Sequence, residues 1–160
     1  MCSAGTGYND DFRKIKIESM DRLTQLKQFI GKEFDQSPSP FMKWLNPIVL
    51  SVEEGQLEFQ YTVRAEWLNP IGNLHGGVTA AIIDDVIGAT MFSLNENSFI
   101  TTINNVIDYF STAKENDNIV AETKIIKRGR QFVNAQCEIW NADKTRLIAR
   151  GTSNLFKINN

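Results

Sequence analysis

The only histidine of the chain, His75, directly precedes a glycine pair, Gly76 and Gly77, at the start of a helix-forming run. A helix that begins at two glycines presents unpaired backbone N–H groups with no side chain in front of them. Such an end favours negative charge, including the charge that develops on a carbonyl oxygen under attack. These three residues therefore predict an oxyanion-binding site.

Two adjacent carboxylates, Asp84 and Asp85, interrupt the same apolar run. A carboxylate in a segment that favours burial is costly unless it is paired or used in chemistry. An acid beside an oxyanion site suggests acyl chemistry, with a thioester carbonyl attacked by an activated water or by the carboxylate. Asp84 is favoured over Asp85, because it lies seven residues after Gly77 and so on nearly the same helix face.

Other catalytic chemistries find little support in the sequence. It contains no Gly-x-Ser-x-Gly motif, phosphate-binding loop or dinucleotide fingerprint. With one histidine and two separated cysteines, no metal site is expected. Each residue singled out also has a structural explanation: the glycines could allow tight loop packing, His75 could bond a nearby carbonyl, and the acids could form a partly solvated patch. Their order ahead of an apolar helix favours the functional interpretation.

The elements that must position these residues follow from periodicity. Apolar residues at helical spacing predict a helix over residues 14–35, ended by the Ser-Pro-Ser-Pro sequence at 37–40. The helix from Gly77 to about Leu94 is apolar on nearly all sides and is therefore expected to be buried. Strand patterns cover six segments, the first two forming a hairpin: 48–52, 57–63, 99–110, 119–127, 132–140 and 146–157.

These elements predict an α+β fold, with an antiparallel sheet of five or six strands around one long central helix. Residues 1–40 are expected to form a tail and an extra helix, and residues 41–160 the main part of a single domain. Residues 1–13 are expected to be frayed. In the strand at 132–140, Cys137 is predicted to point inward, whereas Cys2 lies in the terminal tail.

The composition is that of an ordinary globular domain, with 42% hydrophobic and 22% charged residues over 160 positions. A net charge of −2 argues against nucleic acid as the main partner. No apolar run is expected to span a bilayer, and no signal-peptide core is expected at the N-terminus. The cysteine pattern suggests no disulfide framework, so a reducing, cytoplasmic location is expected.

The run Leu68-Asn69-Pro70-x-Gly72-x-x-His75-Gly76-Gly77, with an aspartate nine residues after the histidine, resembles a known family. It is similar to the hotdog-fold acyl-CoA thioesterases of the phenylacetate-degradation type, in the 4-hydroxybenzoyl-CoA thioesterase superfamily. The order of predicted elements from about residue 47 to 158 is also similar to a hotdog domain. The resemblance implies hydrolysis of an acyl-CoA to a free acid and CoA by a dimer or dimer of dimers. It implies no separate cofactor, because CoA is part of the substrate.

The resemblance also implies roles for the residues of the motif. The N–H of Gly76 or Gly77 would polarise the thioester carbonyl, assisted by Asn69. His75 would orient the loop or assist the leaving thiolate. Asp84 would act as general base or nucleophile.

Further residues are implied outside the motif. Thr102 falls where some members carry a hydroxyl that holds the attacking water. The turn formed by Arg128, Gly129 and Arg130 resembles the basic hairpin near which the CoA phosphates sit, although an ordinary charged turn would look the same. Segment 106–112 lacks the Arg-Pro pair often found at its end in the family.

Helix geometry adds an expectation about assembly. Gly77 and Asp84 are about 10 Å apart along one helix, too far for both to reach one carbonyl carbon. Two helices packed antiparallel about a two-fold axis would bring each N-terminus to the other's Asp84. The alternatives left open are a non-catalytic acyl-CoA-binding or sensing protein on the same fold, and a hotdog hydratase or dehydratase.

Overall fold

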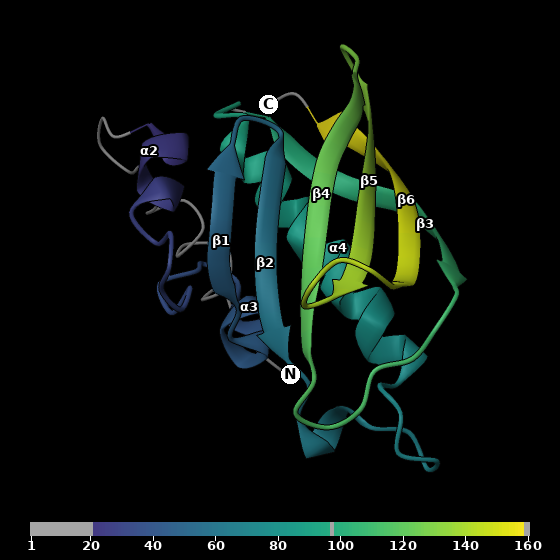
Figure 1. The fold of residues 1–160 in the computed structure, drawn as a ribbon. Coiled ribbons are helices and arrows are strands. Elements are labelled where there is room, and N and C mark those ends of the chain that lie inside the picture. The colour runs from purple at the N-terminus through teal and green to yellow at the C-terminus, as the bar shows by residue number, and fades with distance from the viewer. Residues whose placement is uncertain (1–20, 97, 159–160) are drawn as a thin grey trace, which may run out of the picture.

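A computed structural model describes residues 21–96 and 98–158, in which six strands form one antiparallel sheet that curves around a central helix (Figure 1). The spatial order of the strands is β1-β2-β4-β5-β6-β3, so β1 and β3 lie at the two edges. The strand bounds are Ile48–Glu53 for β1, Gln56–Thr62 for β2, Phe99–Tyr109 for β3, Asn118–Arg128 for β4, Phe132–Asn141 for β5 and Leu147–Ile158 for β6. The predicted α+β hotdog arrangement is confirmed, and the strand boundaries agree with the sequence pattern to within one or two residues.

The central helix, α4, spans Gly76–Ser93. Its sheet-facing side buries Ile82, Ile83, Val86 and Ile87 completely. Its opposite side is not covered by the sheet, and Gly77, Asp84 and Gly88 are exposed there. We call this side the open stripe of α4. The helix is therefore buried on one side only, and the expectation of burial on nearly all sides is wrong for this stripe.

By length and composition, α4 is the one helix in the described part of the chain that could cross a membrane, with a mean hydropathy of 1.2 over 18 residues. The expectation that no apolar run could span a bilayer is therefore wrong when length and composition alone are considered. Packing of α4 against the sheet accounts for the same apolar character, because the core helix of a folded domain needs an apolar face.

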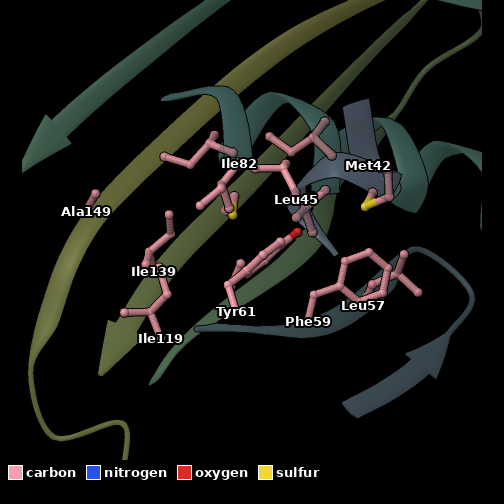
Figure 2. Close-up of a cluster of buried hydrophobic side chains, with 14 of the residues drawn as sticks. Met42, Leu45, Leu57, Phe59, Tyr61, Ile82, Ile119, Ile139 and Ala149 are labelled. Atoms are coloured by element: carbon pink, nitrogen blue, oxygen red, sulfur yellow. The ribbon is translucent and has the colours of Figure 1, made fainter. Parts of the chain in front are cut away.

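The core lies between the curved sheet and α4, where inward-pointing strand residues meet the helix (Figure 2). In β2, the alternating residues Leu57, Phe59 and Tyr61 are all buried, as expected for a strand with one covered face. Cys137 of β5 is also buried, as predicted, and burial raises the pKa of its thiol far above the ordinary range. Cys2 lies outside the described residues.

The N-terminal segment differs from its prediction. Helix α2 covers only Arg22–Lys27, so the predicted helix is wrong for residues 28–35, and residues 14–20 lie outside the described part. Gly31 adopts φ +79°, and residues 30 and 33 on either side of it form bridges to β1. Backbone pairing with β1 thus replaces the helical hydrogen bonds that sequence periodicity had suggested.

A short helix, α3 (Pro40–Leu45), follows the Ser-Pro-Ser-Pro sequence. The Ser39 side chain accepts a hydrogen bond from the Met42 N–H, and Pro40 occupies the first helical position. Serine at the cap and proline at the first turn are favourable at a helix start. The sequence predicted as a helix end is therefore a helix beginning. The division of the chain at residue 40 stays a prediction.

Candidate active site

His75 is held at the start of α4 by the loop before it. Its backbone N–H donates to the Trp67 carbonyl at 2.8 Å, and its Nδ1 accepts from the Gly77 N–H at 2.9 Å. A ring nitrogen that accepts carries no proton, so the neutral ring has its proton on Nε2. His75 is exposed, and this Nε2–H is available to a ligand in front of the helix.

The two glycines consequently differ as donors. The Gly77 N–H is occupied by His75, whereas the Gly76 N–H makes no backbone hydrogen bond among the described residues. The Gly76 carbonyl accepts from the Tyr109 hydroxyl at 3.1 Å, which fixes this peptide against β3. Of the two predicted oxyanion donors, Gly76 is the one left free by the geometry.

Asn69 organises the loop that leads to the histidine. Its side-chain oxygen accepts hydrogen bonds from the backbone N–H groups of Ile71 (3.1 Å) and Asn73 (3.0 Å). Its own carbonyl accepts from Gly72, which has φ +73°, a conformation that favours glycine. Because the oxygen of the amide is used twice, its NH₂ group remains as the donor toward a ligand.

Asp84 lies on the open stripe of α4, beside the edge strand β3. Its Oδ1 accepts two side-chain hydrogen bonds, from the Thr102 hydroxyl at 3.1 Å and from the Asn105 amide at 2.9 Å. Asn105 is anchored in turn by the Ser153 hydroxyl of β6. Two donors on one oxygen fix the orientation of the carboxylate, and Oδ2 is left for chemistry. Thr102, which the resemblance implies would hold the attacking water, donates here to the Asp84 carboxylate, and its role toward water stays a prediction. Asn105 and Ser153 were not predicted.

A β-bulge explains how Thr102 and Asn105 reach the same carboxylate. Residues three apart on a regular strand point to opposite faces. The register of β3 against β6 shifts between Thr102 and Asn104, so Thr102 pairs with Leu155 and Asn105 with Ser153, both buried. The extra residue, Ile103, thus turns Asn105 onto the helix-facing side.

The free Gly76 N–H and the Asp84 carboxylate both lie on the side of α4 that faces β3. Gly76 and Asp84 are eight residues apart, which is about 12 Å along the helix. Tyr109, which contacts Gly76, and Asn105, which contacts Asp84, are four residues apart on β3, which is about 13 Å. The two spacings agree, so β3 runs beside the helix and bonds to both ends of this segment.

Asp85 points to another part of the molecule. Its Oδ1 accepts from the Ser39 hydroxyl at 3.3 Å, and its Oδ2 is buried with no hydrogen-bond partner among the described residues. Burial raises the pKa of Asp85 to about 6, with an opposing effect of the Ser39 hydrogen bond and a further rise from the charge of Asp84. Asp85 therefore does not share the site of Asp84.

The predicted basic turn lies between β4 and β5. Arg128 is committed to ion pairs with Glu96 (2.6 Å) and Glu54 (2.8 Å), and Lys157 pairs with Glu96 at 2.7 Å. Burial alone would raise the pKa of Glu96, but hydrogen bonds from Lys157 and Arg128 outweigh it and lower that pKa. These contacts tie the turn to the C-terminal end of α4 and favour a structural role for Arg128.

The other two residues of the turn differ from Arg128. A Cβ on Gly129 would lie 2.6 Å from the Phe132 carbonyl oxygen, so this close approach requires glycine. Arg130 is exposed beside a cavity of about 320 Å³ that also touches Lys127 and Asn154. It is the arginine of the pair that could bind an external anion.

The arrangement combines backbone and amide donors at the start of α4 with an oriented carboxylate further along the same helix, beside β3. Donors aimed at a developing oxyanion and a carboxylate able to act as base or nucleophile are the requirements of acyl transfer. No three His, Cys, Asp or Glu side chains gather as metal ligands within residues 21–96 and 98–158.

Comparison with known proteins points to the same chemistry. The thioesterase superfamily matches residues 71–148, which include most of the motif, Asp84, Thr102 and the basic turn. Acyl-coenzyme A thioesterase 13 of Homo sapiens is 29% identical over 133 residues, covering 82% of this chain and 94% of that protein.

Two solved structures show the same fold. The Escherichia coli PaaI protein of the phenylacetic acid degradation operon has a TM-score of 0.74 at 20% identity, covering 88% of this chain and 97% of that one. A hypothetical thioesterase protein from Streptococcus pneumoniae, solved with coenzyme A, has a TM-score of 0.67 at 23% identity, covering 71% of this chain and 87% of that one. Fold, motif and relatives agree: the chain is similar to the thioesterase superfamily over residues 71–148, and it is a thioester hydrolase with the hotdog fold.

Proposed function

We propose that this protein hydrolyses acyl-CoA thioesters to a free acid and CoA, at sites shared between the two subunits of a dimer. The observation that carries the proposal is the Asp84 carboxylate, held by Thr102 and Asn105 on the open stripe about 12 Å from the free Gly76 N–H. The substrate class is supported by the relative named acyl-coenzyme A thioesterase and by the S. pneumoniae thioesterase solved with coenzyme A.

In the proposed mechanism, the Gly76 N–H and the Asn69 amide bind the thioester oxygen as it gains negative charge. Asp84 either removes a proton from water, which adds to the carbonyl carbon, or adds directly and forms an anhydride that water then cleaves. In both routes the C–S bond breaks as the carbonyl re-forms, and CoA leaves as a thiolate. His75, exposed at the helix start with its Nδ1 occupied by Gly77, is the residue proposed to donate its Nε2–H to this thiolate.

Two features support the proposed dimer: the separation between Gly76 and Asp84, and the uncovered edge strand β3. The 12 Å between Gly76 and Asp84 prevents one chain from applying both groups to one carbonyl, since a carboxylate side chain reaches back only a few ångströms. The edge strand β3 exposes large apolar side chains on both faces, with Val106 60% and Tyr109 54% exposed. An uncovered apolar edge favours pairing with another strand. Antiparallel pairing of two β3 strands would place two α4 helices side by side and bring each Gly76 toward the partner's open stripe.

The CoA phosphates would bind near the turn at 128–130. Arg130 is the proposed contact there, because Arg128 is already neutralised by Glu54 and Glu96. An exposed arginine without a competing carboxylate can form the charge-assisted, bidentate bonds that phosphates favour.

Subunit complementation tests this function and its shared site together. Gly76→Pro removes the proposed donor at a position where proline is well tolerated, since the first helical residue needs no N–H and His75 already has an extended backbone. Gly76→Ala keeps the N–H and is the matched control, because its Cβ would meet Tyr109 at an ordinary 3.5 Å. Each of the variants Gly76→Pro and Asp84→Asn should be nearly inactive alone on acyl-CoA.

Mixed after unfolding and refolding, the two inactive chains should recover about a quarter of wild-type activity, because half of the dimers would be heterodimers with one intact site. Gly76→Ala should stay active without mixing. Folded, well-mixed heterodimers with no recovered activity would contradict the shared site. A wild-type protein that hydrolyses no acyl-CoA would contradict the function itself.

A further inference from the structure

A cavity of about 760 Å³ lies between the end of α4 and the N-terminal segment. Its apolar lining comes from Gly88, Met91 and Phe92 on one side and from Leu26, Phe29 and Phe34 on the other. We call it the N-terminal groove. It falls in the size range of small-molecule binding sites. The apolar residues provide the larger part of its surface, and polar side chains that include Arg22, Gln25, Lys43 and Glu96 line the rest.

The groove continues into a smaller inner chamber of about 210 Å³. The two cavities share Leu26, Phe34, Gly88 and Phe92 as lining residues, and the chamber extends to Met42 and Asp85. Its lining is apolar apart from Asp85 and three small polar or proline positions at 37–39. The groove thus leads from the surface toward a mostly apolar space beneath α3.

Both elements that form the candidate active site also form the mouth of the groove. On α4, Gly88 lies one helical turn beyond Asp84, about 6 Å along the axis and on the same open stripe. On β3, Ile100 lines the groove two residues before Thr102, and alternation places both on the helix-facing side. A thioester whose carbonyl is attacked by Asp84 therefore has the groove directly beside it.

We propose that the N-terminal groove binds the acyl chain of the substrate, and that Gly88 is the residue that admits medium and long unbranched aliphatic chains. This inference rests on the proposed thioesterase function and adds its substrate class. The region of α4 from Asp84 to Phe92 provides about 12 Å of groove length. Residues 22–43, which lie before the segment matched by the superfamily, supply the facing wall.

Gly88 has the features of a position kept open for a ligand. A Cβ at this position would meet no heavy atom within 4 Å, so close packing does not require the glycine. Its backbone has an ordinary helical conformation, so φ does not require it either. Glycine inside a helix costs about 1 kcal/mol relative to alanine. The remaining effect of glycine at this position is that it leaves the space beside the helix open.

The acyl chain fits this space better than the pantetheine arm of CoA does. Polar side chains such as Gln25, Gln28 and Gln36 line the groove itself, but the inner chamber is mostly apolar. The two amide groups of the arm would be costly to bury in that chamber without hydrogen-bond partners, and the arm must emerge to reach the exposed nucleotide. The groove wall offers Phe29, Phe34 and Phe92, with the Phe29 and Phe34 rings 5.0 Å apart. An aliphatic chain gains from each buried methylene in such a lining.

A graded series at Gly88 tests the proposal. The variants Gly88→Ala, Gly88→Leu and Gly88→Phe fill the mouth progressively, and kcat/KM is measured for acetyl-, hexanoyl-, decanoyl- and hexadecanoyl-CoA. Gly88→Ala should unfold at a higher temperature, because alanine favours the helix, and should lower kcat/KM for hexadecanoyl-CoA the least of the three variants. The two larger residues should lower kcat/KM for hexadecanoyl-CoA by at least about tenfold and leave acetyl-CoA within about threefold, with the affected chain length falling as the residue grows.

Ile100→Phe narrows the same groove from β3 and should reproduce the loss on long chains, which provides a test even if a large residue on α4 prevents folding. Equal losses on acetyl- and hexadecanoyl-CoA would place the pantetheine arm in the groove and overturn the proposal. Unchanged long-chain activity in Gly88→Phe would place the acyl chain elsewhere and also overturn it. If wild type shows no turnover, the affinity of the same variants for non-hydrolysable acyl-CoA thioethers still tests the groove. Failure of the proposed hydrolysis is therefore distinguishable from failure of the proposed acyl-chain site.

Discussion

Asp84 and Asp85 are neighbours in the chain but belong to different regions of the molecule. They point about 100° apart around α4, because the helix has 3.6 residues per turn. Asp84 faces β3 on the open stripe and accepts from Thr102 and Asn105. Asp85 faces the N-terminal segment, where its Oδ1 accepts from Ser39 and its Oδ2 is buried without a hydrogen bond in the described part of the chain.

The comparison shows how packing gives one residue type two properties. Around Asp84, donors from an adjacent strand orient an exposed carboxylate, as catalysis by a base or nucleophile requires. Around Asp85, an apolar surrounding makes the charged form costly and moves its pKa to about 6. A raised pKa is often taken as a sign of a catalytic acid. Here the geometry favours the other carboxylate, Asp84, for the proposed chemistry.

The largest expected effect is the difference in turnover between the two acids. Asp84→Asn should lower kcat by at least about a hundredfold, since it removes the proposed base or nucleophile but keeps the side-chain shape. Asp85→Asn should change kcat by less than about threefold. Steady-state hydrolysis of one acyl-CoA, with circular dichroism to confirm folding, checks both variants. The reverse order of losses would assign the chemistry to Asp85.

A smaller effect is expected from the residues that position Asp84. Thr102→Val and Asn105→Ala should each lower kcat by about tenfold with little change in KM, because each removes one hydrogen bond that orients the carboxylate. Thr102→Ser should restore most of the activity. Thr101→Val, on the opposite face of β3, is the matched control and should resemble wild type. An increase in KM with unchanged kcat would show that these residues bind substrate instead.

The smallest effect concerns stability near Asp85. Its folded pKa of about 6 exceeds the ordinary value of about 3.9, so the folded state favours the neutral acid. The stability this provides is fully present below about pH 4 and is lost as pH rises through about 6, because the folded protein must then carry a partly buried charge. Asp85→Asn should therefore raise the melting temperature by a few degrees at pH 8 and leave it unchanged at pH 4.

The exposed variant Asp35→Asn controls for the change in net charge and should show little dependence on pH. Thermal unfolding at both pH values provides the measurement. The difference should be modest, because solvent screens a carboxyl group that is only partly buried. A lower melting temperature for Asp85→Asn at pH 8 would mean that the ionised carboxylate makes a stabilising contact in the native protein.

Local patterns determined much of this protein. Alternation in strands and the apolar run of α4 gave the element order, because both report which side of a segment is covered. The sequence around His75 also predicted a helix start with free donors, since two glycines leave nothing in front of the backbone. The choice of Asp84 over Asp85 follows from helix periodicity, and in the structure Thr102 donates a hydrogen bond to Asp84.

Other features depended on contacts between distant segments. Gly31 and its neighbours pair with β1, which ends the predicted N-terminal helix at Lys27. The bulge at Ile103 depends on the register against β6, and it alone brings Asn105 to Asp84. The ion pairs that occupy Arg128 come from carboxylates 32 and 74 residues away. A local pattern can indicate that a side chain faces inward or outward, but only the folded chain decides which partners share its space, because hydrogen bonds and ion pairs act over a few ångströms between residues far apart in sequence.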